Sequence, residues 1–485
     1  MTRLRRLIGP PGAARACALT VAALVAACAS KPPPAEVAAR RTAVETARNP
    51  NAAPVRQSGS PAAPPPAPAA RPTPVQTTTT SAGRGTAAPA AQQGTPAPAP
   101  AASRDSERDA RWRQDLDVLE RELVERHPDA FFAGTRADFD RKVAQLRHSI
   151  PAMTDDEVVV ALWGVAASLR DGHTGVTWPE GDRAFRRLPI ECKGFSDGVY
   201  VVAARPEDAA LIGGRVLKVG TMTTDQALLR LEGVRACENP AARQDTLPQL
   251  LSVPEVLTAL HIETQRDRVR MEVVCPDARI RSVELPALGG TVDLERRPPR
   301  PATPPPPYDL EVRPEERALI LTYRACRTDP GECFCRTAER IFMESSRWPN
   351  PKLVVDLRDN PGGDALTMAP LFEGLKERYH LRGHVAVIVN GGTYSAAVQN
   401  AVQLQLLANA KVIGEPTGGQ VNSFGDLRTF RLPNSGLLVY YPARRVKQTD
   451  EPPGSMRPDV LVRTTYADWA AGRDPAMATA LKSLP

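Results

Sequence analysis

The segment Val385-Ala-Val-Ile-Val-Asn-Gly-Gly-Thr-Tyr-Ser-Ala-Ala-Val398 combines a strand, a glycine turn and the start of a helix. Its first five residues are apolar and mostly β-branched, which predicts a buried strand that ends at Asn390-Gly-Gly392. A run of Ala, Val, Leu and Gln with helical spacing follows, so Ser395 lies at the head of a helix. Unpaired backbone N–H groups there suit a nucleophile whose attack creates an oxyanion. Serine is also an ordinary N-cap residue, and this segment alone favours the cap.

A second strand and turn has the sequence Leu353-Val-Val-Asp-Leu-Arg-Asp-Asn-Pro-Gly-Gly-Asp364. The apolar residues predict another buried strand, and a helix is expected over residues 365–378. Gly362 and Gly363 allow backbone amides to approach a ligand closely. The same glycines also suit a tight strand-to-helix connection with no role in binding.

A third segment, Leu169-Arg-Asp-Gly-His-Thr174, follows a helix whose start is marked by a capping box from Thr154 to Glu157. This helix is apolar nearly all round, which indicates that it is buried. It should end at a Gly172 C-cap and present His173 from inside the protein. A single histidine at a helix end is more often structural than catalytic.

Taken together, these segments resemble the serine peptidase family of the C-terminal-processing (tail-specific) proteases and the tricorn core protease. The resemblance runs from about Ala110 to the C-terminus and rests on five motifs in order. They are Asp171-Gly-His-Thr, Asp356-Leu-Arg-Asp-Asn-Pro-Gly-Gly, Thr393-Tyr-Ser-Ala-Ala, Gly414-Glu-Pro-Thr-Gly-Gly and Pro458-Asp459-Val. No single motif would be specific.

The resemblance also separates two catalytic versions of the family. In the processing proteases the base is a lysine 25 residues after the serine, where this chain has Gln420. A neutral amide cannot accept the hydroxyl proton, so the chain is closer to the tricorn-like branch, which uses a histidine. That histidine would be His173, with Glu451 as the assisting carboxylate and the adjacent Asp450 as the alternative.

The oxyanion hole implied by the resemblance consists of one glycine of the Gly362 and Gly363 pair, together with the amide of Ala396. Ser395 would attack a carbonyl carbon while neutral His173 accepts its proton and later donates it to the leaving amine. No metal and no cofactor are expected in this chemistry.

The expected fold is α/β. Strands at 353–357, 385–389 and 411–413, separated by helices, predict a parallel sheet within residues 308–485, and the resemblance implies that this peptidase core is crotonase-like. Residues 107–185 should form a helical N-terminal domain that carries His173. Residues 186–290 look like a PDZ-like domain, whose groove is either open to peptides or closed, and 291–307 form a Pro-rich linker.

The N-terminus is typical of an exported lipoprotein. Residues 1–27 combine an Arg-rich start with a short apolar run, which predicts a signal peptide. Val25-Ala-Ala-Cys28 resembles a bacterial lipobox, with Cys28 as the lipidated residue. Residues 28–106 are dominated by Pro, Ala and Thr and are expected to form a disordered tether. The protein is therefore expected on the bacterial cell envelope, in the outer membrane facing the periplasm if the host is Gram-negative.

Charge gives little reason to expect a nucleic-acid partner. Removal of residues 1–27 takes away four arginines and no acidic residue, so the formal net charge falls from +7 to +3. The sequence contains no zinc-ligand spacing on a helix, no phosphate-binding P-loop and no GxSxG motif.

Besides Cys28, six cysteines remain in the exported part of the chain, which is consistent with up to three disulfides of undetermined pairing. The closely spaced Cys326, Cys333 and Cys335 favour a disulfide over a metal site, because no histidine accompanies them.

The sequence therefore predicts a lipid-anchored serine endopeptidase that cuts extended or unfolded polypeptides. A catalytically inactive peptide-binding lipoprotein of the same fold is the main alternative, because Gln420 replaces the lysine. An esterase or transpeptidase that uses the same acyl-enzyme is a third. The sequence determines neither the cleavage specificity nor the oligomeric state.

Overall fold

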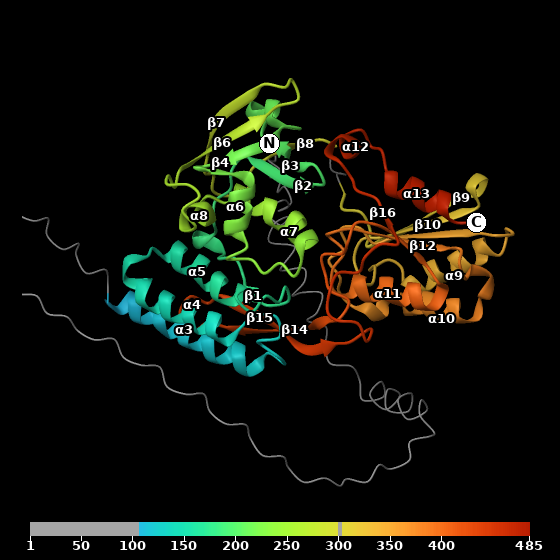
Figure 1. The fold of residues 1–485 in the computed structure, drawn as a ribbon, viewed down its shortest axis with the longest axis horizontal. Coiled ribbons are helices and arrows are strands. Elements are labelled where there is room, and N and C mark those ends of the chain that lie inside the picture. Colours follow the sequence, from blue (N-terminus) through green and yellow to red (C-terminus); the bar gives the residue numbers. More distant parts are fainter. Residues whose placement is uncertain (1–105, 299–302) are drawn as a thin grey trace, which may run out of the picture. The chain divides into compact units, whose positions relative to one another are not determined.

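The computed structural model describes residues 106–298 and 303–485 (Figure 1). The predicted signal peptide, Cys28, the predicted tether up to residue 105 and part of the Pro-rich linker lie outside the described residues. Within the described ranges, no helix has the length and apolar character needed to cross a membrane.

The C-terminal part of the chain is built on a six-stranded sheet with the order β16-β13-β12-β11-β10-β9. All neighbouring strands are parallel except β9 and β10, so the predicted parallel sheet is confirmed. The strands are β9 (Tyr308–Arg313), β10 (Ala318–Tyr323), β11 (Lys352–Asp356), β12 (Val385–Val389), β13 (Lys411–Gly414) and β16 (Val460–Leu461).

Helices cover both faces of this sheet, as the continuous apolar strands require. Side chains alternate along β12: Val385, Val387 and Val389 pack with α9, α10 and α11, whereas Ala386 and Ile388 pack with α13. Figure 1 shows the same two layers around the central strands. The helices are α9 (Phe334–Ser345), α10 (Ala369–Glu377), α11 (Ala396–Ala408) and α13 (Pro475–Ser483). The helix expected over 365–378 is a 3-10 turn at Ala365–Met368 followed by α10.

In the part of the chain that the structure describes, three α-helices precede the first strand. They are α3 (Ser106–Arg126), α4 (Arg136–Ser149) and α5 (Asp155–Ala167). Thr135 caps α4 through the Asp138 amide, and Thr154 forms the predicted capping box with Glu157 at the start of α5. Buried leucines at helical spacing hold α3 against its neighbours.

Residues 190–296 form an antiparallel sheet with the order β2-β3-β4-β6-β7, in which β5 pairs with β4 and β8 pairs with β3. The strands are β2 (Ile190–Phe195), β3 (Gly198–Ala204), β4 (Arg215–Val219), β5 (Met222–Thr223), β6 (Arg268–Val274), β7 (Ile280–Pro286) and β8 (Glu295–Arg296). Helix α6 (Thr224–Leu231) begins with a capping box formed by Thr223 and Gln226. The short helices α7 (Pro240–Thr246) and α8 (Pro254–Ala259) were not expected.

A third sheet joins distant parts of the chain. Strand β1 (Gly175–Val176), directly after the segment that carries His173, pairs with β15 (Leu438–Val446), which pairs with β14 (Ser423–Arg431). The hairpin of β14 and β15 therefore contacts the N-terminal part of the chain. One hydrophobic cluster includes side chains from α3, α4 and α5, from the antiparallel sheet and from this hairpin.

The cysteines form one disulfide among the described residues, between Cys333 and Cys335. Cys192, Cys237, Cys275 and Cys326 are free. The structure thus contains a disulfide in the predicted cluster, but Cys326 does not take part in it.

Candidate active site

Ser395 lies between β12 and α11, in the strand-to-helix connection that the sequence predicts. Its backbone has a φ of 51° and a ψ of −123°, a conformation that is strained for a residue with a side chain. The serine side chain makes no capping hydrogen bond to the helix. Ser395 therefore does not act as an ordinary N-cap, and its hydroxyl is not engaged in capping α11.

A glycine loop lies directly against the head of α11. A Cβ atom on Gly362 would lie 2.7 Å from the Ser395 Cβ and 2.9 Å from the Ala396 nitrogen, and Gly362 has a φ of +99°. Only glycine fits this position without displacement of the serine. Within the described ranges, no acceptor pairs with the amide of Ala396.

The structure distinguishes the two glycines of this loop. The Gly362 amide donates to Asn360 Oδ1 at 2.9 Å, so it is already occupied. The Gly363 amide has no acceptor among the described residues, although Gly362 and Asp364 on either side pair with the backbone of Cys326. Asn360 is fully buried and also donates to the Tyr323 carbonyl at 2.6 Å, which fixes the loop.

His173 follows the end of α5 at Ala167, and its side chain is 1% exposed. The chain turns at Arg170, which has a φ of 57°, so the expected glycine C-cap at Gly172 is wrong. Asp171 holds the turn that follows: it accepts from the His173 amide at 3.1 Å and from Thr174 Oγ1 at 2.6 Å.

Two carboxylates flank the His173 ring. Its Nδ1 lies 3.7 Å from Asp171 Oδ1 and 3.7 Å from Glu238 Oε1. Burial opposes protonation of the imidazole, but the two carboxylates outweigh it and raise the pKa of His173 to about 9. Neither ring nitrogen is hydrogen-bonded to any described residue, so Ser395 and His173 are not hydrogen-bonded to each other here.

Glu238, at the start of the turn into α7, links several parts of the site. Its carboxylate accepts from the Gly172 amide at 3.0 Å, the Tyr394 hydroxyl at 2.7 Å and the Gln420 amide at 3.2 Å. Glu238 could not be recognised in the sequence, because Cys237-Glu-Asn-Pro240 matches none of the five motifs.

The two acidic residues predicted to assist His173 are exposed and have other partners. Glu451 is exposed, and its backbone carbonyl accepts from Asn422 Nδ2 at 2.6 Å. Asp450 is also exposed and pairs with Lys447 at 2.6 Å. The carboxylates that the structure brings to His173 are instead Asp171 and Glu238.

His127, directly after α3, contacts this cluster through Asp171. Its Nε2 lies 3.1 Å from Asp171 Oδ2, and its Nδ1 accepts from the Asp129 amide at 3.0 Å, so Nε2 carries the proton. Burial raises the pKa of Asp171, but hydrogen bonds from His127, His173 and Thr174 bring it below its usual range. Asp171 is therefore an anion next to the His173 ring.

Asp171, His173 and Glu238 also form a group whose ligand atoms lie within 4.8 Å of one another, the one such group found in the described part of the chain. Both carboxylates already accept hydrogen bonds from protein donors. This donor set fits a protonated imidazole held between two anions better than it fits a metal ion.

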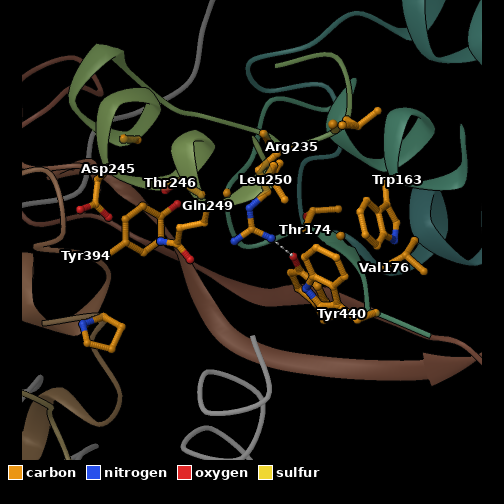
Figure 2. Close-up of a pocket in the computed structure, with 18 of the residues that line it drawn as sticks. Trp163, Thr174, Val176, Arg235, Asp245, Thr246, Gln249, Leu250, Tyr394 and Tyr440 are labelled. Carbon is orange, nitrogen blue, oxygen red and sulfur yellow. Dashed lines mark hydrogen bonds between the residues drawn. The ribbon is translucent and has the colours of Figure 1, made fainter. Parts of the chain in front are cut away.

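A cleft of about 140 Å³ opens beside Tyr394 (Figure 2). Its lining includes Pro361, which precedes Gly362 in the chain, and Tyr394, which precedes Ser395. Figure 2 shows an apolar end with Trp163 and Val176 on the side away from Tyr394. That apolar end is lined by Trp163, Ala167, Val176, Trp178, Val234 and Leu250.

This chain shares its fold with solved structures of proteases. Mature CPAF complexed with lactacystin matches with a TM-score of 0.54 and 14% identity, and the match covers 78% of this chain and 100% of that chain. Mature CPAF alone gives 0.53 and 14%, with 78% and 98% covered. The tricorn protease matches with a TM-score of 0.36 and 14% identity over 77% of this chain and 36% of that chain.

The model of peptidase family S41 matches residues 368–451, which include Ser395 and Gln420. This segment of the chain is thus similar to the S41 peptidases. The match supports a hydrolase of the serine peptidase class, and the fold is mixed α/β, as the sequence predicted. The search among curated proteins found no match for this chain.

Proposed function

We propose that this protein is an envelope-anchored endopeptidase that hydrolyses extended or unfolded polypeptides through an acyl-enzyme on Ser395. The observation that carries the proposal is the strained, uncapped Ser395 at the head of α11, next to the unpaired amide of Ala396. Strain of this kind at a functional position is retained when the surrounding structure enforces it.

In the proposed reaction Ser395 Oγ attacks the carbonyl carbon of the scissile peptide bond, and His173 accepts the hydroxyl proton. The amides of Ala396 and Gly363 stabilise the oxyanion, since the Gly362 amide is occupied by Asn360. Each such donor contributes on the order of 3 kcal/mol to the transition state. His173 then protonates the leaving amine, and water releases the acyl group by the reverse steps.

We assign the carboxylate that assists His173 to Glu238 rather than Glu451. Glu238 lies 3.7 Å from the ring and is fixed by three donors, whereas Glu451 is exposed. The carboxylate would stabilise the imidazolium that forms during the attack, in the manner of a triad.

The proposal includes a lipid anchor on Cys28, a tether over 28–106 and an envelope location, all of which rest on the sequence. It also includes a crotonase-like core, a helical cap carrying His173 and a PDZ-like module. The parallel sheet flanked by helices and the separate antiparallel sheet support this division.

The test is fluorophosphonate labelling of the folded protein without its tether, in the parent and in the Ser395→Ala and His173→Ala variants. Labelling that is lost in both variants supports the assigned nucleophile and base. If the Ser395→Ala protein still hydrolysed a denatured protein substrate, the nucleophile would be wrong.

An inactive peptide-binding lipoprotein is the second candidate. Two observations favour it: Gln420 occupies the lysine position, and no hydrogen bond joins the described Ser395 and His173 side chains. This candidate predicts that peptides bind the parent and the Ser395→Ala variant equally, with no labelling and no turnover.

A further inference from the structure

Arg235 is a cation in the cleft without a matching anion. It follows α6 and lines the cleft beside Tyr394, and Figure 2 shows it extending toward Tyr440. Its Nη1 donates to the Tyr440 hydroxyl at 3.0 Å. Among the described residues no carboxylate pairs with Arg235. A partly buried guanidinium that meets only neutral groups is costly unless a ligand supplies the anion.

The nearby acidic side chain does not fill this role. Asp245 also lines the cleft, but no ion pair joins it to Arg235 among the residues that the structure describes. Within the described ranges, the side-chain contact of Arg235 is its hydrogen bond to the hydroxyl of Tyr440. The positive charge of Arg235 therefore faces the cleft.

The apolar end of the cleft is equally well defined. The rings of Trp163 and Trp178 lie 4.6 Å apart, edge to face, and Arg187 covers the face of Trp178. With Val176 and Leu250 they form a rigid wall next to Arg235. A volume of about 140 Å³ holds a side chain rather than a folded partner.

We propose that Arg235 binds a carboxylate of the peptide substrate, while an apolar side chain of the same peptide packs against Trp163 and Leu250. The inference rests on the proposed peptidase function, because Tyr394, the residue before Ser395, lines the cleft. The carboxylate comes either from an internal Asp or Glu side chain or from the free C-terminus of the peptide. Arg235 is thus a specificity-determining residue, and it selects peptides that pair an acidic group with an apolar one.

The experiment measures peptide binding to the Ser395→Ala protein, so that it does not depend on turnover. Three fluorescent nonapeptide pools share a central leucine and random flanking positions without acidic residues. The first has Glu beside the leucine and an amidated C-terminus, the second has Gln with a free C-terminus, and the third has Gln with an amidated C-terminus.

We expect the first or the second pool to bind about tenfold or more tightly than the third, as a charge-assisted pair would give. A preference for the first identifies a side-chain carboxylate, and a preference for the second identifies the C-terminus. In the Ser395→Ala background, Arg235→Gln should reduce the ratio to about one, and Arg235→Lys should retain part of it. Arg215→Gln, an exposed change on β4, is the matched control and should leave the ratio unchanged.

Equal binding of the three pools, or no measurable binding of any, overturns the inference, provided that thermal unfolding shows each protein to be folded. Hydrolysis of the same pools by the parent protein separates the two proposals. If a pool is preferred but not hydrolysed, the carboxylate site is supported and the peptidase mechanism is contradicted. If the pools are hydrolysed without preference, the peptidase mechanism is supported and the carboxylate site is contradicted.

Discussion

The ring of Tyr394 stacks on the imidazole of His173, with centroids 5.1 Å apart and planes inclined by 29°. Through its hydroxyl Tyr394 also donates to Glu238, which lies beside the same imidazole. The residue directly before the candidate nucleophile is therefore fixed against the candidate base and its carboxylate. A substitution of Glu238 should consequently alter the position of both the His173 ring and the turn at Ser395.

The first prediction concerns pH. His173 has a pKa raised to about 9, so at neutral pH the imidazole is mostly protonated and cannot accept the serine proton. The rate of fluorophosphonate labelling should rise with pH and level off above about 9. Asp171, Glu238 and Tyr394 are the titratable groups that face the ring, and Tyr394 stays protonated because burial and the charge of Glu238 raise its pKa well above its usual value. A labelling rate that is constant from pH 6 to 9 would contradict this assignment.

The second prediction compares the two acidic candidates. Glu238→Gln removes one of two anions beside the ring, so the pKa of His173 should fall and the labelling profile should move about 1 pH unit lower. The reaction itself should slow at high pH, because the imidazolium loses a stabilising charge. Glu451→Gln is the matched control: its exposed side chain should leave both the profile and the rate as they are in the parent protein. If Glu451→Gln changed the profile and the rate and Glu238→Gln did not, Glu451 would be the assisting carboxylate.

The sequence predicted the local geometry of the site better than its long-range contacts. Strand, turn and helix around Ser395 follow from apolar periodicity and glycine, and the Thr154 capping box follows from residue spacing. The missing cap at Ser395 could not be predicted, because the positive φ depends on the loop of Gly362 packing against it. Glu238 was missed for a similar reason: its three donors come from segments 66, 156 and 182 residues away.

The third prediction concerns the glycine loop. Asn360→Ala removes the acceptor of the Gly362 amide and leaves the buried Tyr323 carbonyl without its donor. Stability should fall by about 2 kcal/mol, the cost of an unsatisfied buried group. The labelling rate of the folded protein should fall about tenfold or more, because the Gly363 amide loses its fixed position. Urea unfolding and labelling kinetics measure the two effects. Labelling at the parent rate would show that Asn360 does not position the loop.

The last prediction concerns the packing of the β14–β15 turn onto α3. Asp115 is fully buried, and its carboxylate accepts from the Asn434 and Ser435 amides, both at 2.8 Å. Asp115→Ala leaves these two amides unpaired, so the free energy of unfolding should fall by about 3 kcal/mol.

The same hairpin pairs through β15 with β1, which begins at Gly175, two residues after His173. A loosened hairpin should therefore also slow the labelling of Ser395 in molecules that remain folded. Asp117→Ala is the control on the same helix, because Asp117 forms an exposed ion pair with Arg147 and its loss should cost less than about 1 kcal/mol. Urea unfolding with an unchanged m-value gives both free energies. Equal effects of the two substitutions would mean that the buried carboxylate does not hold the turn.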